Sequence, residues 1–258
     1  MCNRIFKPGR NVLKYASFLV MLAVIAGSLF TSCPKPSSSP ASPKGSWTWI
    51  DRTAAAGSRN WQSIASSSDG SKLAAVVYGG GIYTSADYGA TWTHRATDRN
   101  RNNWDSIASS SDGSKLAAVV WGGVIYTSAD SGETWVHQSA ASSRNWDSIA
   151  SSSDGSKLAA VVNGGSIYTS ADSGETWIPR AANRNRYWES IVSSSDGSKL
   201  AAVASGWGVY TSADSGATWT DHSTAAGIKN WRSIASSSDG NKLAAVVRGE
   251  GIYTGVFQ

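Results

Sequence analysis

Residues able to do acid–base chemistry recur at one position of a repeated stretch of this sequence. Five tryptophans spaced 42 or 43 residues apart are each followed by a polar residue, which is an acid in three copies: Asp105, Asp147 and Glu189. The other two copies carry Gln62 and Arg232. Two carboxylates about 5–10 Å apart can hydrolyse a glycosidic bond. If the copies form a ring, these acids would face one channel, so a glycosidase is one hypothesis. We favour the other, that they are solvated charges at a rim.

The remaining residue types that commonly support catalysis do not form a recognisable set. The three histidines, His94, His137 and His222, each follow a second repeated tryptophan by two or three residues. Two cysteines and scattered histidines give no zinc-ligand spacing, and no Ser–His–Asp set stands out in a chain so rich in serine. We therefore expect no catalytic residues, no metal and no cofactor.

Aromatic and amide side chains at one end of the repeat favour binding instead. A concave site lined by mixed apolar and polar groups suits a ligand, since aromatic faces pack on sugar C–H groups and amides bond hydroxyls. The turn between the second and third strands of each copy carries the most varied residues: Tyr78, Trp121, Asn163, Trp207 and Arg248. The segment before each first strand supplies Asn60, Asn103, Asn145 and Asn230, with Tyr187 in the fourth copy.

The repeated tryptophans themselves are ambiguous. They are Trp61, Trp104, Trp146, Trp188 and Trp231. They adjoin the predicted ligand-binding residues, so we include them in that set. The alternative is that they pack in the core between neighbouring copies.

Each copy contains four short predicted strands, which in the first copy span residues 61–67, 72–78, 81–85 and 91–95. The intervening S-S-D-G-S and A-D-Y-G segments are turn sequences, because Asp supplies local hydrogen bonds and Gly accepts positive φ. Tight turns make successive strands antiparallel neighbours. Four strands in a period of about 40–45 residues are typical of a β-propeller blade. No helical periodicity is visible in residues 45–258.

The two ends of the repeat region predict closure of a ring. The last copy stops after three strands, whereas residues 46–52 align with the fourth-strand segment 89–95. A solenoid would need polar capping copies, and none is visible. We predict an all-β, five-bladed propeller of four-stranded antiparallel blades, in which the N-terminal strand completes the last blade and leaves no open edge. The blades would span about 61–103, 104–145, 146–187, 188–230, and 231–258 with 46–60.

Four copies contain the sequence S-A-D-x-G-x-T-W, at residues 85–92, 128–135, 170–177 and 212–219. This sequence resembles the Asp-box, or BNR repeat, S-x-D-x-G-x-x-W. The resemblance covers residues 46–258 and implies hairpins on the propeller face opposite the ligand site. It also implies a structural role in the turns for Asp87, Asp130, Asp172 and Asp214. One carboxylate per turn provides too few oxygens for calcium.

The same motif is best known from sialidases, which this chain resembles in its repeat alone. Sialidases have six blades, an arginine cluster, a Tyr–Glu pair, an Asp acid and an Arg-Ile-Pro motif, whereas this chain offers only Ile178-Pro179-Arg180. We therefore expect a non-catalytic, monomeric binding module, lectin-like and carbohydrate-binding, by analogy with five-bladed lectins of the tachylectin type. The alternative is a protein-binding scaffold or assembly factor in the envelope. A sialidase-like glycoside hydrolase is the third hypothesis.

The N-terminus has the composition of a secretory signal. Four basic residues without an acid precede the apolar run 15–30, which is too short for a comfortable membrane span. Residues 29–33, L-F-T-S-C, resemble the bacterial lipobox, which implies acylation of Cys33. We predict a lipoprotein signal peptide at 1–32 and a Pro/Ser-rich tether at 33–45. An uncleaved signal anchor is the alternative.

These features predict a location and exclude one class of partner. Acylated Cys33 would anchor the protein to the membrane of a bacterial cell envelope, and Pro34 after it permits the outer membrane or the cell surface. Without residues 1–32 the net charge of +5 falls to +1. We therefore expect no nucleic-acid partner, and a glycan or an envelope protein as the ligand.

Overall fold

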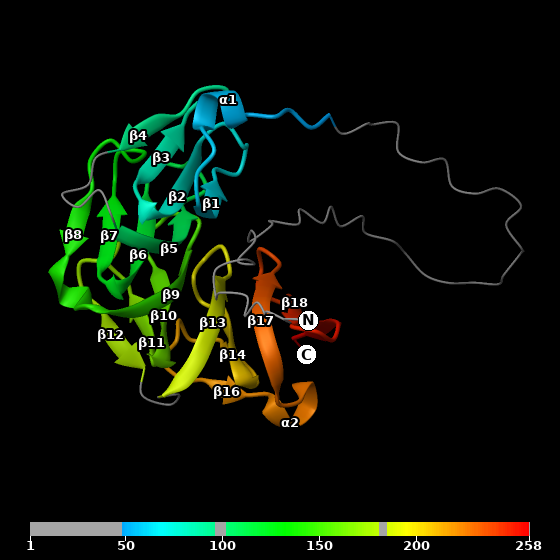
Figure 1. The fold of residues 1–258 in the computed structure, drawn as a ribbon. Helices are drawn as coiled ribbons and strands as arrows, with labels where there is room; N and C mark the ends of the chain where they lie inside the picture. Colours follow the sequence, from blue (N-terminus) through cyan, green and yellow to red (C-terminus); the bar gives the residue numbers. More distant parts are fainter. Residues whose placement is uncertain (1–47, 96–101, 181–184, 258) are drawn as a thin grey trace, which may run out of the picture.

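The computed structural model describes residues 48–95, 102–180 and 185–257, which form five repeat units of antiparallel strands (Figure 1). The predicted signal peptide, Cys33, the tether and residues 46–47 lie outside the described residues. The all-β prediction is confirmed.

We number the units from the N-terminus. The first three units contain β1 Trp61–Ser66, β2 Leu73–Gly80, β3 Ile82–Ser85 and β4 Thr93–Arg95; β5 Asn102–Ser109, β6 Leu116–Gly123, β7 Ile125–Ser128 and β8 Val136–Gln138; and β9 Arg144–Ser151, β10 Leu158–Gly165, β11 Ile167–Ser170 and β12 Ile178–Arg180.

The fourth unit has four strands and the fifth has three. They comprise β13 Arg186–Ser193, β14 Leu200–Trp207, β15 Val209–Ser212 and β16 Thr220–Asp221; then β17 Lys229–Ser236, β18 Lys242–Val247 and β19 Ile252–Val256. Three single helical turns are not indicated by any sequence periodicity: α1 Thr53–Ala56 precedes the first unit, and a 3-10 turn at Ser139–Ala141 and α2 Ser223–Ala226 lie between later units. No described helix has the length and apolar character needed to cross a membrane.

The S-S-D-G-S turns explain why the first two strands of each unit form a hairpin. In the first unit, Asp69 Oδ1 accepts hydrogen bonds from Ser67 Oγ at 2.6 Å and from the Ser71 N–H at 3.0 Å. Gly70 takes φ +76°, a conformation that costs glycine little. The turn brings β1 and β2 together, with Ser66 opposite Leu73.

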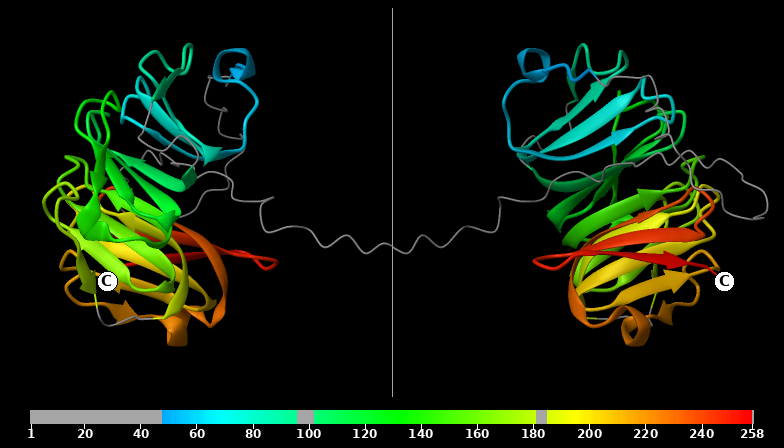
Figure 2. Two further views of the ribbon diagram at one scale, coloured as in Figure 1. Left: turned by 60° about the vertical axis from the view of Figure 1, so that its left-hand side comes forward. Right: turned by 90° about the vertical axis from the view of Figure 1, so that its right-hand side faces the viewer.

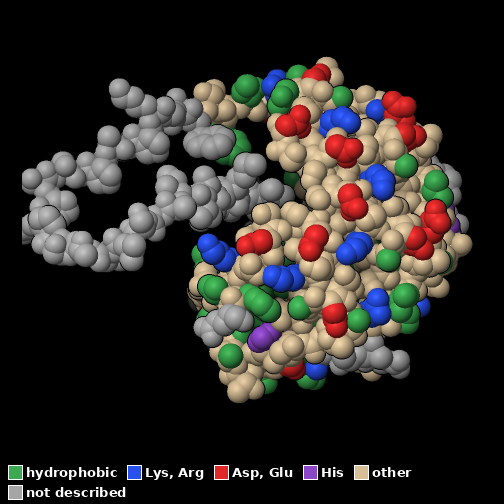
Figure 3. All heavy atoms as spheres, turned by 180° about the vertical axis from the view of Figure 1, so that it is seen from behind, with side chains coloured by type: hydrophobic (Ala, Val, Ile, Leu, Met, Phe, Trp, Pro, Cys, Tyr) green, Lys and Arg blue, Asp and Glu red, His purple; other side chains and the backbone are tan. Residues whose placement is uncertain are grey.

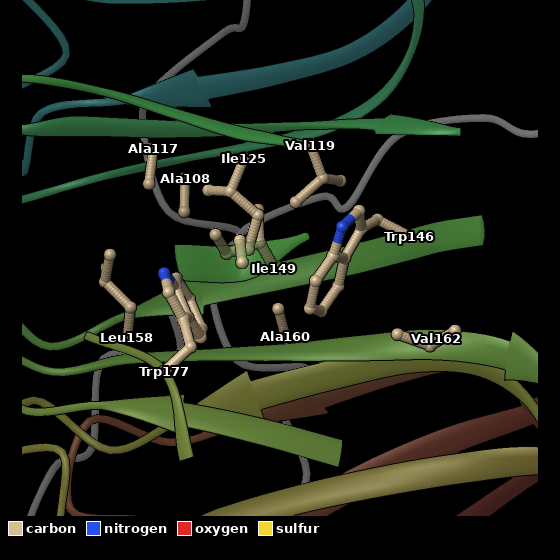
Figure 4. Close-up of a cluster of buried hydrophobic side chains, with 11 residues drawn as sticks. Ala108, Ala117, Val119, Ile125, Trp146, Ile149, Leu158, Ala160, Val162 and Trp177 are labelled. Atoms are coloured by element: carbon tan, nitrogen blue, oxygen red, sulfur yellow. The ribbon is translucent and has the colours of Figure 1, made fainter. Parts of the chain in front are cut away.

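The hydrophobic core lies between units rather than within one. In the cluster of Figure 4, Trp146 and Ile149 of β9 face Val119 and Ile125 of the preceding unit, and Trp177 closes one side. An equivalent cluster fills each of the other three junctions. Each of the three middle units is therefore stabilised by two neighbours, and each end unit by one.

Hydrogen bonds join successive units in the same way at all four junctions. In one row, the N–H of a serine donates to the carbonyl oxygen of the equivalent serine in the next unit, at 2.7 Å each time. The serines of this row are Ser68, Ser111, Ser153, Ser195 and Ser238. A second row joins inner strands: the Ile107 N–H donates to Ser63 Oγ at 3.3 Å, and this bond recurs between later units. The four junctions thus share one geometry.

The structure corrects the predicted closure of the ring. Residues 48–52 belong to no strand, and among the described strands β19 pairs with β18 alone. The units form an open arc with β1 and β17 at separate ends (Figure 1), and the red hairpin of the last unit projects from the molecule (Figure 2). Residues 48–51 are exposed, and the following turn is joined to β1: the Thr53 N–H donates to Asp51 Oδ1 at 2.8 Å, and Trp61 Nε1 donates to the Gly57 carbonyl at 3.2 Å.

Candidate ligand-binding site

Two predicted sets of residues meet at one end of the arc because the second strand of each of the first four units continues onto the next unit. Tyr78 lies opposite Asn103 of the second unit, and its N–H also donates to the Asn60 carbonyl at 2.9 Å. Trp121 lies opposite Asn145, Asn163 opposite Tyr187, Trp207 opposite Lys229, and the Arg248 N–H donates to the Asn230 carbonyl. We call Tyr78, Trp121, Asn163, Trp207 and Arg248 the turn rim.

Most of these side chains are open to solvent. Trp207 is 41 % exposed and Tyr187 is 60 % exposed. Tyr78, Trp121, Asn163 and Asn103 are half-buried, whereas Arg248, Asn60, Asn145 and Asn230 are exposed. The turn rim and its asparagine neighbours therefore form an accessible surface with aromatic and amide groups.

The repeated inner-strand tryptophans do not belong to this surface, which corrects their inclusion among the ligand-binding residues. Trp104, Trp146 and Trp188 are 0 % exposed and Trp231 is 1 % exposed. Each packs edge-on against a tyrosine of the third strand, as Trp146 does against Tyr168 at 5.1 Å between centroids. Trp61 alone is half-buried, because no unit precedes it. Their place is the core between units.

The polar residue after each tryptophan lies in a β-bulge. Between Trp61 and Ser63 the pairing with β2 skips one residue, and the same irregularity recurs in the other four inner strands. A bulge leaves its extra residue outside the ladder and redirects the side chain. We call this set the bulge row: Gln62, Asp105, Asp147, Glu189 and Arg232.

The structure also corrects the interpretation of the bulge row as solvated charges. Asp105 is 7 % exposed and Asp147 is 5 % exposed. Gln62 Nε2 donates to Asp105 Oδ1 at 2.8 Å, and Arg232 forms an ion pair with Glu189 across the last junction. These side chains connect neighbouring inner strands.

Asn163 connects the bulge row to the turn rim. Its Nδ2 lies 3.4 Å from Asp147 Oδ2 and 3.4 Å from the Trp188 carbonyl oxygen. A buried carboxylate thus lies within hydrogen-bond distance of an amide of the turn rim.

Basic residues that the sequence pattern did not single out stack on the aromatic layer at this end. The Arg186 guanidinium carbon lies 4.3 Å from the Trp207 ring centroid and 4.7 Å from that of Tyr210. Arg186 therefore covers one face of Trp207 and leaves less of that ring for a ligand. Burial raises the pKa of Tyr210 to about 12, so its hydroxyl stays neutral. A recurring basic residue two positions before the tryptophan was the available signal: Arg59, Arg144, Arg186 and Lys229.

The S-A-D-x-G-x-T-W hairpins lie at the opposite end, since Ser85 pairs with Leu73 at the far end of β2 from the Tyr78 turn. Asp87 accepts hydrogen bonds from Ser85 Oγ, the Thr91 N–H and Thr91 Oγ1 at 2.7–2.8 Å. These bonds lower the pKa of Asp87 to about 2. The same contacts recur at Asp130, Asp172 and Asp214. The carboxylates are thus engaged within their own turns.

Two hollows of about 380 and 410 Å³ also lie toward this opposite end, between the first and second units and between the second and third. The first is lined by Lys72, Asp87 and Arg95 among others. Seen from behind, basic and acidic side chains are interspersed over the surface (Figure 3). Neither hollow is lined by a residue of the turn rim.

The three histidines lie in separate environments. His94 stacks on Tyr83 at 4.9 Å, His137 lies against Tyr126 at 5.4 Å, and His222 bonds Thr211 Oγ1. Within residues 48–95, 102–180 and 185–257, no three His, Cys, Asp or Glu side chains are grouped so as to hold a metal ion.

No protein-family model and no curated protein matches this chain. Similar solved structures are β-propeller proteins. An ancestral GH74 enzyme has a TM-score of 0.60 at 17 % identity, over 73 % of this chain and 27 % of its own. YCF48 bound to D1 peptide gives 0.57 at 18 % identity, over 76 % of this chain and 64 % of its own. A nidogen/laminin complex has a TM-score of 0.59 at 13 % identity, over 75 % of this chain and 74 % of its own. The chain spans less than a third of the ancestral GH74 enzyme. At these identities the likeness shows the fold: a propeller-like array of antiparallel units.

Proposed function

We propose that this protein is a non-catalytic binding module whose turn rim recognises carbohydrate. One observation carries the proposal: on otherwise uniform units, the residues that vary at the turn rim are mainly aromatic or amide, and they lie beside the asparagines at one accessible end. Tyr78 and Trp121 offer ring surface beside the asparagines Asn103 and Asn145. Sugars present both C–H faces and hydroxyls, and this alternation of rings and amides complements both.

The repetition of the units supports weak, multivalent recognition. Tyr78, Trp121 and Asn163 occupy equivalent positions on three successive units, so one extended glycan could contact several units at once. Linked weak sites gain avidity without any new contact. Cys33 acylation, with anchoring at a bacterial envelope, would place such a surface beside glycans, and this location belongs to the proposal.

The non-catalytic part of the proposal draws on the bulge row. A glycosidase needs one accessible carboxylate to protonate a leaving group and another to act as nucleophile or base. Asp105 and Asp147 are buried, and Asp105 accepts a hydrogen bond from Gln62. Their contacts suit a role in joining units.

We likewise propose that the S-A-D-x-G-x-T-W hairpins are Asp-boxes that stabilise each unit. The contacts of Asp87 with Ser85 and Thr91 support this assignment. Trp92 Nε1 also donates to the Gly89 carbonyl at 3.1 Å, which ties the motif tryptophan to its own turn.

A glycan array probed with the full chain tests carbohydrate binding. Trp121→Ala and Tyr78→Ala should each reduce the signal at least tenfold. Tyr88→Ala is the matched control, because Tyr88 is 65 % exposed but lies on a hairpin at the opposite end. Loss of binding in the control, or full binding in both rim variants, would contradict the proposal.

A protein-binding scaffold is the second candidate, because two similar structures are complexes with a peptide or a protein, YCF48 with D1 peptide and nidogen with laminin. A silent array together with an envelope protein whose binding depends on Trp121 would favour the scaffold. Hydrolysis of a fluorogenic sialoside or of xyloglucan, the latter tested because one similar structure is a xyloglucanase, would overturn both.

A further inference from the structure

The two ends of the arc expose faces that are buried at every internal junction. Val246 and Ile252 of the last unit are 37 % and 75 % exposed, whereas their equivalents Val119 and Ile125 are both 0 % exposed. At the other end, Ile64 is 42 % exposed and its equivalent Ile107 is 5 % exposed. Each end therefore presents half of a hydrophobic core.

These two halves are complementary, because every internal junction is built from the same two parts. The leading unit supplies residues such as Ala74, Val76 and Ile82, and the following unit supplies Trp104 and Ile107. The last unit repeats the first part with Ala244, Val246 and Ile252. The first unit repeats the second part with Trp61 and Ile64.

The segment before β1 already has the shape it would need in such a junction. Residues 51–57 match residues 221–227, which link the fourth strand of one unit to the first strand of the next. In both segments an Asp Oδ1 accepts a backbone N–H two residues on at 2.8 Å, as Asp51 does from Thr53 and Asp221 from Ser223. Both end at a glycine, with φ/ψ of 79°/154° at Gly57 and 84°/155° at Gly227.

We propose that the last unit of one molecule docks on the first unit of a second copy of this chain, head to tail. Residues 48–51 of the second copy would then pair with β19 of the first molecule, in the position that the fourth strand takes in the other units. In the fourth unit Thr211 pairs with Thr220, so the matching pair is Thr254 with Ile50 of the other copy.

Electrostatics permits this contact. The bulge row would continue from Arg232 of one copy to Gln62 of the next, which brings no like charges together and offers the amide oxygen as an acceptor for the guanidinium. A second copy fits better than the same chain, since four identical junctions set the angle between units and hold the two ends apart (Figure 1).

Analytical ultracentrifugation of the full chain, with Cys2 and Cys33 changed to serine, tests the association. The average mass should rise with concentration above the 27.0 kDa of one chain, because a head-to-tail contact leaves both outer faces free. Val246→Glu and Ile64→Glu should each remain at one chain mass. When the two variants are mixed one to one, they should form a dimer and no larger species. The Ile64 variant keeps an intact last unit and the Val246 variant an intact first unit, so only one productive contact can form.

Val136→Glu is the matched control, because Val136 is 58 % exposed on β8, away from both faces, and should assemble like the parent. Unchanged thermal unfolding of the three variants would show that they fold. A parent chain that stays at 27.0 kDa at all concentrations, or a mixture that stays monomeric while the parent assembles, would overturn the proposal.

Cross-linking separates a second copy from closure within one chain. Chains with Ile50→Cys and chains with Thr254→Cys should form a disulfide-linked pair when mixed. If a chain carrying both cysteines instead cross-links internally at high dilution, the occupant is the chain's own N-terminal segment and the proposal is wrong. Neither result depends on ligand binding at the turn rim.

Discussion

Gln62 and Asp105, which are 43 residues apart in the sequence, are joined by a hydrogen bond of 2.8 Å between the amide nitrogen of one and a carboxylate oxygen of the other. The bond connects the bulges of two neighbouring inner strands, where Asp105 is buried. The position that first suggested catalysis therefore serves as a link between units.

Removing the Gln62 side chain should destabilise the first junction. Gln62→Ala takes away a donor from a buried carboxylate, which costs about 1–3 kcal/mol. Urea unfolding monitored by circular dichroism measures the change. Asn60→Ala, at an exposed position close by, should change stability by less than about 0.5 kcal/mol. Equal effects of the two substitutions would refute the structural role of the bond.

Buried and exposed aromatic residues should differ sharply in their contribution to stability. Trp146→Ala removes a fully buried ring from the core of Figure 4 and should cost about 3–5 kcal/mol. Tyr187→Ala, at a 60 % exposed position, should leave the free energy of unfolding within about 0.5 kcal/mol. Denaturant titration of both variants measures the two changes. A loss of less than about 1 kcal/mol in Trp146→Ala would contradict the assignment of Trp146 to the core.

The hairpin aspartates should make stability depend on acid pH. Hydrogen bonds from Thr134 lower the pKa of Asp130 from 3.8 to about 2. Because the folded pKa is depressed, the carboxylate contributes stability above pH 3.8, and this contribution is lost as the pH falls through about 2. The Tm should therefore fall between about pH 4 and pH 2, and fall less in Asp130→Asn. Thermal melting curves recorded across this pH range test the prediction. If the Tm of Asp130→Asn falls with pH as steeply as that of the parent, the prediction is wrong.

The glycine in the turn between the second and third strands should resist substitution for conformational reasons alone. Gly164 has φ +73° and no atom within 4 Å of the place that an alanine methyl group would take, so Gly164→Ala should cost about 1 kcal/mol through backbone strain. Gly251→Ala is the control, since Gly251 is equally open and does not have positive φ. Thermal unfolding distinguishes the two variants. An unchanged Tm in Gly164→Ala would be inconsistent with a positive φ at Gly164.

The strands were predictable because their signals are local. The Asp and Gly of S-S-D-G-S set the hairpin between β1 and β2 without help from distant residues. The sequence pattern does not indicate that β2 continues onto the next unit and sets Tyr78 opposite Asn103. The two loop sets were nevertheless expected at one end because they adjoin equivalent strand ends.

The arc and the buried tryptophans depended on information that sequence spacing does not contain. Alignment of residues 46–52 with 89–95 indicates which strand could complete the last unit, but closure depends on the angle at each junction. The position of Trp146 beside a loop suggested a ligand contact, whereas its side chain turns toward Val119 of the neighbouring unit. A bulge between Trp104 and Ser106 likewise redirects Asp105 in a way that an alternating strand pattern does not indicate.

The row of serine hydrogen bonds from Ser68 to Ser238 is the same at every junction between units. A unit gained or lost by recombination between the near-identical copies would meet the same neighbours as before. The length of the array can therefore change in evolution by whole units while every remaining contact is kept, and the number of turn-rim residues would change with it.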